Sequence, residues 1–183
     1  MKILEQIERY VPFNEQEARD REVILDYLRR HPGAFERSDL IAHMTASAWI
    51  VNPARTKVVM VYHRIYDSWS WTGGHADGDR DLLAVALREA REETGLQKVR
   101  PVSGEIYSLE VLTVDGHEKR GEYVPSHLHL NVTYLLEADE GEELHVCEEE
   151  NAGVRWFTLD GALRASTEPW FVERIYRKLN DKL

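Results

Sequence analysis

The spacing of apolar residues differs between the two ends of the chain and its middle. Residues 1–31 carry an apolar stripe at helical spacing and are therefore predicted to be helical. Within them, Asn14 and Glu17 have the spacing of a capping box, and Pro32-Gly33 is expected to end the helical region. The stripe consists of Val23, Ile24, Tyr27 and Leu28.

The middle of the chain alternates between strand-like segments and one strongly helical segment. Residues 81–94 are rich in alanine, leucine, arginine and glutamate and are followed by Gly95, which predicts a helix that ends there. Segments rich in β-branched and aromatic residues, separated by turn-forming residues, predict strands. The predicted strands cover residues 46–51, 57–62, 106–114, 128–136 and 154–157.

A last helix is expected after Thr167, its predicted N-cap, with Pro169 in the first turn. Strands around one central helix, with helices at both ends, indicate an α/β (α+β) fold and favour an α/β/α sandwich. We expect residues 1–35 to form an N-terminal helical extension. Residues 36–183 are expected to form one domain that includes the C-terminal helix.

Composition and charge narrow the classes of function. A net charge of −10 argues against broad binding to nucleic acid or to an anionic membrane. No apolar run approaches the roughly 18 residues that span a bilayer, and no export signal is recognised at the N-terminus. The single cysteine, Cys147, gives no reason to expect an oxidising compartment, so a cytoplasmic location is expected. A phosphate compound would need local positive charge, which a divalent metal ion supplies.

Three glutamates of the predicted helix, Glu89, Glu92 and Glu93, fall within an arc of roughly 100° on a helical wheel. Two carboxylates about 6 Å apart repel by roughly 0.7 kcal/mol in water and by about 3 kcal/mol at an effective dielectric constant of 20. A cation among the carboxylates would offset this cost, and hard oxygen ligands suit Mg²⁺ or Mn²⁺. Taken alone, however, the three glutamates also fit a solvated acidic helix face.

A set of residues between positions 74 and 96 has a characteristic spacing: Gly74, Arg88, Glu89, Ala90, Glu92, Glu93, Gly95 and Leu96. In this spacing the segment resembles the Nudix box. Two positions depart from the family pattern: Arg80 stands where the box usually has glutamate, and Thr72 stands where proline commonly precedes the double glycine.

The resemblance to the Nudix hydrolase family implies a Nudix-type α/β/α sandwich with a mixed sheet. It implies Mg²⁺ or Mn²⁺ held by Glu89, Glu92 and Glu93, with Glu92, Glu89 and Arg88 as the catalytic group and Arg88 orienting the carboxylates. The implied reaction is hydrolysis of a phosphate anhydride in a nucleoside diphosphate-linked compound, a nucleotide or a related organic pyrophosphate. Which glutamate is the general base is left open, and the acidic run at residues 148–150 is a further candidate beside its interpretation as solvated charge.

Further residues are candidates for binding the substrate. The double glycine allows close approach of a phosphate or metal. His75 directly follows the double glycine, and His127 and His129 share one face at the start of the predicted strand, so these histidines offer polar contacts. These candidates are Gly73, Gly74, His75, His127 and His129. For His75, the alternative is a structural role in the turn. For His127 and His129, the alternatives are a solvated or hydrogen-bonded sheet face, or a two-histidine metal site without a recognisable third ligand. The charged loop at residues 115–125 either covers a site or is solvated.

Two other functions stay open at this point. A non-catalytic nucleotide-binding or sensor domain is compatible with Arg80 in the box. Isopentenyl diphosphate isomerase shares the fold that the resemblance implies, but the surroundings of Cys147 do not look like those of its cysteine. The apolar stripe of residues 1–31 needs a covering surface, which a homodimer would also provide.

Overall fold

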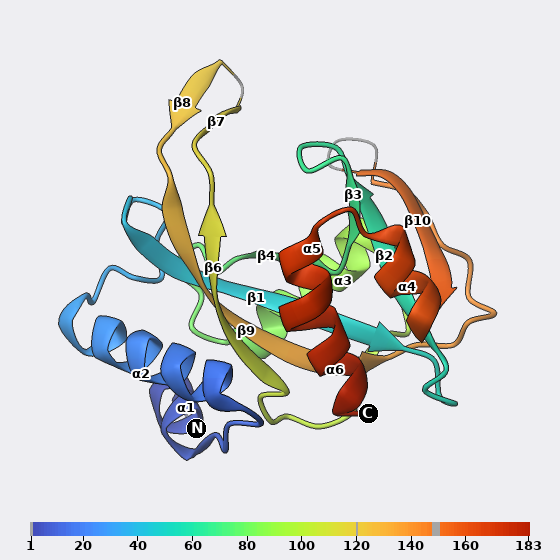
Figure 1. Ribbon diagram of the computed structural model, residues 1–183, viewed down its shortest axis with the longest axis horizontal. Helices are drawn as coiled ribbons and strands as arrows, with labels where there is room; N and C mark the ends of the chain where they lie inside the picture. The colour runs from blue at the N-terminus through green and yellow to red at the C-terminus, as the bar shows by residue number, and fades with distance from the viewer. Residues whose placement is uncertain (1, 120, 148–150) are drawn as a thin grey trace.

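A computed structural model describes residues 2–119, 121–147 and 151–183, and the order of its elements follows the predicted pattern (Figure 1). The helices are α1 (Ile3–Arg9), α2 (Glu15–Arg30), α3 (Leu82–Thr94), α4 (Leu159–Ala165), α5 (Pro169–Phe171), the π-helical segment η1 (Val172–Tyr176) and α6 (Arg177–Asp181). The strands are β1 (Ala42–Val51), β2 (Lys57–His63), β3 (Ser68–Ser70), β4 (Thr72–His75), β5 (Arg100–Pro101), β6 (Ser108–Val114), β7 (His117–Lys119), β8 (Glu122–Val124), β9 (His127–Glu137) and β10 (Asn151–Thr158).

The sheet is mixed, and its centre is a parallel pair. Strands β1 and β9 run parallel, with Ala42 beside Leu128 at one end and Val51 beside Glu137 at the other. The order of the strands in the sheet is β10-β2-β1-β9-β5. Antiparallel neighbours continue the sheet, with β4 on β1 and β6 on β9. All residues of β1 are buried, as expected for a strand covered on both faces. The predicted mixed sheet is therefore confirmed.

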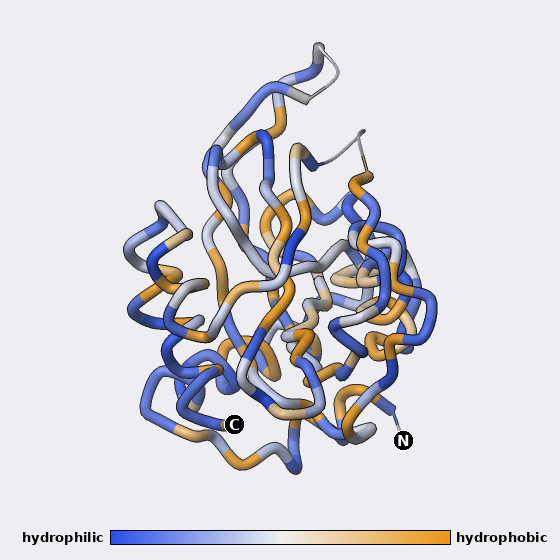
Figure 2. The backbone as a smooth tube through the Cα atoms, turned by 90° about the vertical axis from the view of Figure 1, so that its right-hand side faces the viewer, coloured by the Kyte–Doolittle hydropathy of each residue, from blue (hydrophilic) through white to orange (hydrophobic). Residues whose placement is uncertain are grey.

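Two apolar clusters, one on each face of the sheet, hold the layers together. On one face, Leu82, Val85 and Ala86 of α3 pack against the sheet residues that face them. On the other face, Ile175 and Leu179 of the C-terminal helices join a separate cluster with the opposite sheet residues. Figure 1 shows α3 behind the central strands and α5 and α6 in front of them, and Figure 2 shows the hydrophobic segments gathered in the interior. The α/β/α sandwich is confirmed.

The predicted helical region at the N-terminus consists of two helices that pack on the domain. Residues 10–14 are not helical and separate α1 from α2, and the Asn14 side chain caps α2 by accepting a hydrogen bond from the Glu17 backbone at 2.9 Å. Ile7 and Ile24 are fully buried and belong to the same cluster as α3. The extension therefore shares the hydrophobic core of the domain.

Two local features differ from the sequence-based expectations. Thr167 is not the cap of the C-terminal helix: the N-cap position is Glu168 without a side-chain cap, and the Thr167 hydroxyl instead donates to the Asp67 carbonyl at 3.2 Å. Within the segment expected to be a loop, β7 and β8 form a hairpin that projects from the body (Figure 1). In the described part of the chain, none of the helices combines the length and the apolar character of a membrane span.

Candidate functional site

The local structure of the Nudix-like helix is set by its two ends. The Asp81 side chain accepts a hydrogen bond from the Ala84 backbone at 3.1 Å, and thus caps the first turn of α3. Asp79 in turn accepts from the Asp81 backbone N–H at 2.9 Å, which fixes the loop before the cap. At the other end Gly95 has φ 77°, the left-handed conformation that favours glycine, and it ends the helix as predicted.

The double glycine lies on β4, the strand that precedes α3 in the sequence, and β4 pairs with β1. A β-carbon on Gly73 would lie 2.5 Å from Oγ of Ser47 and 2.8 Å from the carbonyl oxygen of Ala46. A β-carbon on Gly74 would lie 2.5 Å from Oε2 of Glu89. Both glycines are therefore needed for close approach: the first to the neighbouring strand, the second to a helix carboxylate.

Glu93, the last glutamate of the box, is buried and tied to the strand that precedes the helix. Its Oε1 accepts a hydrogen bond from the Gly73 backbone N–H at 2.8 Å, and its Oε2 accepts one from Nδ2 of Asn151 at 3.2 Å. The side-chain contact to Asn151, at the start of β10, was not predicted, because no motif marks that asparagine in the sequence. These two hydrogen bonds fix the orientation of the Glu93 carboxylate.

The other two glutamates of the box have different surroundings. Oε1 of Glu89 accepts from Nη2 of Arg88 at 3.1 Å, and the Glu89 side chain is only 16% exposed. Glu92 is exposed on the solvent side of the helix. The three carboxylates thus occupy a buried, a half-buried and an exposed position rather than one uniform acidic face. Residues 148–150, the further acidic candidate, lie outside the described residues.

Arg80, the departure from the box, points away from the glutamates. Its guanidinium lies over the Phe35 ring at 4.5 Å from the centroid, and Nη2 is 3.5 Å from the Pro32 carbonyl oxygen. It lines a cavity of about 740 Å³ between the N-terminal helices and the start of α3. Glu89, Glu92 and Glu93 are not among the described residues that line this cavity. Arg80 fastens the loop before α3 to the N-terminal segment.

A second cavity, of about 610 Å³, adjoins the double glycine and Glu93 and is the candidate substrate site. Residues of β1, β4, β6 and β9 line it, as do residues of the β7–β8 hairpin, so the hairpin borders the site. Trp71, Tyr66 and Phe171 supply aromatic surface. All five predicted substrate-binding residues line it: Gly73, Gly74, His75, His127 and His129. Arg88, Glu89 and Glu92 are not part of its described lining.

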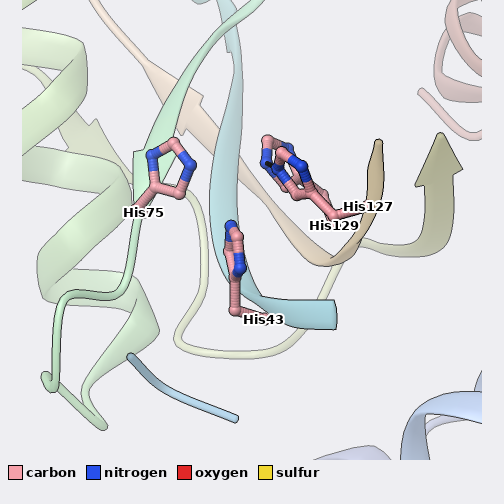
Figure 3. Close-up of side chains that lie close together, drawn as sticks. All are labelled: His43, His75, His127 and His129. Atoms are coloured by element: carbon pink, nitrogen blue, oxygen red, sulfur yellow. Dashed lines mark hydrogen bonds between the residues drawn. The ribbon is translucent and has the colours of Figure 1, made fainter. Parts of the chain in front are cut away.

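Four histidines from three strands meet in the wall of this cavity (Figure 3). His43 lies on β1, directly beside His129 of β9 in the parallel register, and His75 comes from β4. One ring nitrogen from each of the four, including His127, lies within 4.8 Å of the others. The sequence analysis named three of them, His75, His127 and His129, as candidates for binding the substrate. His43 was missed because only the pairing of β1 with β9 brings it to the group.

Burial and neighbouring histidines lower the pKa values of two members of this group, His43 and His129. Burial, followed by the neighbouring histidines, lowers the pKa of His129 to about 2. Burial likewise lowers the pKa of His43, and the charge that His127 would carry adds to this effect. Neutral imidazoles carry one lone pair and one N–H each, so at neutral pH these two rings are able to act as ligands or hydrogen-bond partners.

A buried polar network supports the sheet behind the histidines. Oδ1 of Asn131 accepts hydrogen bonds from the hydroxyls of Thr45 and Ser47 at 2.9 and 3.0 Å, and its Nδ2 donates to Glu110 at 2.9 Å. Nζ of Lys178 donates to the other Glu110 oxygen at 3.0 Å. The cavity floor is therefore fixed by satisfied hydrogen bonds rather than by apolar packing alone.

The fold and the site define a class: α/β/α proteins that present a glutamate-rich helix beside a cavity with both polar and apolar lining. A family model described as "NUDIX domain" matches residues 42–179 of this chain. The chain therefore belongs to the Nudix family. The match begins after α2, so the N-terminal helices lie outside it.

Solved structures support the fold at low sequence identity. A C. elegans Ap4A hydrolase is 16% identical, with a TM-score of 0.51, covering 76% of this chain and 93% of that one. A Clostridium perfringens hydrolase of the NUDIX family is 20% identical, with a TM-score of 0.53, covering 76% and 96%. The E. coli dihydroneopterin triphosphate pyrophosphohydrolase is 12% identical, with a TM-score of 0.57, covering 76% and 96%. None of the curated proteins compared matches this chain.

Proposed function

We propose that this protein is a divalent-metal-dependent hydrolase that cleaves a phosphate anhydride in a nucleoside diphosphate-linked compound, a nucleotide or a related organic pyrophosphate. The observation that carries the proposal is the bond from the Gly73 backbone to Glu93, which holds a box carboxylate at the edge of a 610 Å³ cavity. Membership of the Nudix family supports the reaction class. The names of two structural neighbours, an Ap4A hydrolase and a dihydroneopterin triphosphate pyrophosphohydrolase, agree with it.

Glu89, Glu92 and Glu93 would hold Mg²⁺ or Mn²⁺. The donor set fits such a hard cation, because it offers carboxylate oxygens only. The absence of a side chain at Gly74 leaves the space that the Glu89 carboxylate occupies, which supports this fit. A bound ion would polarise a phosphoryl oxygen and lower the pKa of the attacking water.

The protein's own groups would then position the reactants. Arg88 orients Glu89 through their 3.1 Å contact, and the Gly73 backbone orients Glu93. Glu92 or Glu89 takes the proton from the attacking water. Trp71 and the other aromatic residues of the cavity offer stacking surface to a base or another planar group.

A hydrolysis screen over nucleotides and nucleoside diphosphate conjugates, with Mg²⁺ and with Mn²⁺, tests the proposal. We expect metal-dependent turnover that falls by at least about 10²-fold in Glu92→Gln, since proton transfer or metal binding is impaired. Glu22→Gln is the matched control, because Glu22 is also an exposed helical glutamate but lies on α2. Full activity in EDTA would contradict the proposal. Tight nucleotide binding without turnover by the wild type would instead identify a sensor domain.

The isomerase alternative finds no support at the site, because Cys147 is not part of the described lining of the cavity. The cytoplasmic location, the lack of broad nucleic-acid binding and the homodimer stay predictions.

A further inference from the structure

We propose that His43, His75, His127 and His129 bind one transition-metal ion of the Zn²⁺ type in the cavity wall, at a site separate from the box glutamates. The four rings come from β1, β4 and β9 and face a common space (Figure 3). This proposal goes beyond the hydrolase function, because neither the Nudix box nor the proposed reaction requires these histidines.

The spacing of the ring nitrogens is close to that of a metal site. Two nitrogens bound to one Zn²⁺ at about 2.0–2.1 Å lie roughly 3.3–3.4 Å apart at the tetrahedral angle. The Nε2 atoms of His127 and His129 are already 3.2 Å apart. The full set lies within 4.8 Å, so ring movements of about 1 Å complete the geometry.

Backbone carbonyls orient two of the rings as ligands. Nδ1 of His43 lies 3.0 Å from the Asp39 carbonyl oxygen, and Nδ1 of His127 lies 2.8 Å from that of Pro125. A carbonyl oxygen only accepts hydrogen bonds, so each Nδ1 carries a proton and leaves Nε2 as the ligand atom. This arrangement, in which the second nitrogen donates to a backbone carbonyl, is usual for metal-bound histidine.

One of these lone pairs is buried without a partner. His43 is 5% exposed, and its Nε2 has no hydrogen-bond partner among the described residues. A buried polar atom without a partner is destabilising, and an ion between the four rings would satisfy it. Because Nδ1 is held by Asp39, a simple ring flip would move the unsatisfied atom rather than remove it.

The donor set selects the kind of ion. The group contains four imidazoles and no carboxylate. Imidazole suits Zn²⁺, Ni²⁺, Cu²⁺ and Fe²⁺, whereas Mg²⁺ requires oxygen ligands. The ion would place positive charge on the wall of a cavity in a protein of net charge −10. Because His75 directly follows Gly74, an ion bound to His75 would also stiffen the strand that contacts Glu89 and Glu93.

Metal content provides the direct test. Tag-free full-length protein is stripped with a chelator, loaded with Zn²⁺ or Co²⁺, desalted and analysed for bound metal. We expect one retained equivalent, a visible Co²⁺ spectrum typical of nitrogen ligands, and a rise in Tm of about 5–10 °C at a free metal concentration roughly 100 times Kd. Less than about a tenth of an equivalent in the wild type would overturn the proposal.

Variants assign the retained ion to the histidines. His43→Ala and the part-exposed His75→Ala should each weaken binding by at least about 100-fold, because even loss of an outer-shell partner costs 10–100-fold. His117→Ala, a cavity-lining histidine outside the group, and Glu92→Gln should retain the equivalent. Unchanged binding in both ligand variants, or loss in Glu92→Gln, would also contradict the proposal. Neither readout depends on hydrolysis, so a failed substrate screen leaves this result interpretable.

Discussion

The backbone N–H of Gly73 donates to Oε1 of Glu93 at 2.8 Å, and this single bond joins the strand before the Nudix helix to the helix's last turn. Asn151 holds the other carboxylate oxygen from β10. Strands β4 and β10, one on each side of α3 in the sequence, thus fix one carboxylate of the helix. Its position is set by the fold, whereas that of the exposed Glu92 is set by the helix alone.

Glu93→Gln should separate the chemical role of Glu93 from its structural one. The amide oxygen still accepts from Gly73, and Asn151 is able to rotate its amide, because its buried Oδ1 has no partner among the described residues. We expect stability within about 1 kcal/mol of wild type but kcat lower by at least about 10²-fold. Glu93→Ala, which leaves the Gly73 N–H unsatisfied, should lose about 1–3 kcal/mol in denaturant unfolding. Equal stability of both variants would refute the structural part of this prediction.

Alanine at Gly74 should lower activity, whereas alanine at Gly73 should lower stability. For Gly74→Ala the three atoms nearest the added β-carbon belong to the flexible end of Glu89, so this variant should unfold much as wild type does. It should lower kcat/KM by about 10²-fold, because a 1 Å displacement of a catalytic group has that effect. Gly73→Ala meets backbone atoms of Ala46 and Ser47 and should lose about 1–3 kcal/mol of stability. Steady-state kinetics and urea unfolding of both variants decide between this pattern and a uniform loss.

Arg80→Glu restores the usual box residue and should change kcat/KM by less than about tenfold, equivalent to about 1.4 kcal/mol. The guanidinium contacts Phe35 and Pro32 rather than the box glutamates, so its removal should mainly cost about 0.5–1 kcal/mol of stability. Arg80→Gln serves as the charge-neutral comparison. An inert wild type with an active Arg80→Glu would mean that the natural protein is not a hydrolase.

Acid should destabilise the protein through Glu17, which is completely buried. Burial alone would raise its pKa, but hydrogen bonds from Tyr10 and Phe13 and the charges of Lys178 and Lys182 together lower it below the usual 4.5. A lowered pKa in the folded state stabilises the protein above the unfolded-state pKa, and this contribution disappears as pH falls through the folded-state value. The free energy of unfolding should therefore decline below about pH 4.5.

Glu17→Gln should remove part of that acid dependence. It should also lower the free energy of unfolding at pH 7 by about 3–5 kcal/mol, because it breaks a buried ion pair. Glu22→Gln, an exposed substitution on the same helix, should leave the pH profile unchanged. The free energy of unfolding measured from pH 3 to 7 compares the three proteins, and identical slopes would exclude Glu17 as the titrating group.

Neighbouring residues of α2 test whether the N-terminal extension is part of the core. Ile24→Ala should cost about 2–5 kcal/mol, since Ile24 is fully buried in the cluster shared with α3. Val23→Ala should cost less than about 0.5 kcal/mol, because Val23 is 47% exposed. Equal, small effects in thermal unfolding would show that the extension is a dispensable attachment.

The sequence alone determined the position of the Nudix helix and the residues that begin and end it. The cap at Asp81, the stop at Gly95 and the register of the glutamates are all local, because helix geometry relates residues a few positions apart. Alternating polarity likewise predicted that His127 and His129 share a face, and both line the cavity. Each of these features follows from short-range periodicity and can therefore be recognised within a single segment of the sequence.

Only the tertiary structure decided how these segments meet. The helical wheel placed Glu92 and Glu93 together, but packing against β4 and β10 buries one and leaves the other in solvent. His43 and His129 are 86 residues apart and become neighbours because β1 and β9 pair in parallel. Strand periodicity specifies which face a residue occupies but not which strand lies beside it. That choice depends on the packing of the whole sheet between its two helical layers.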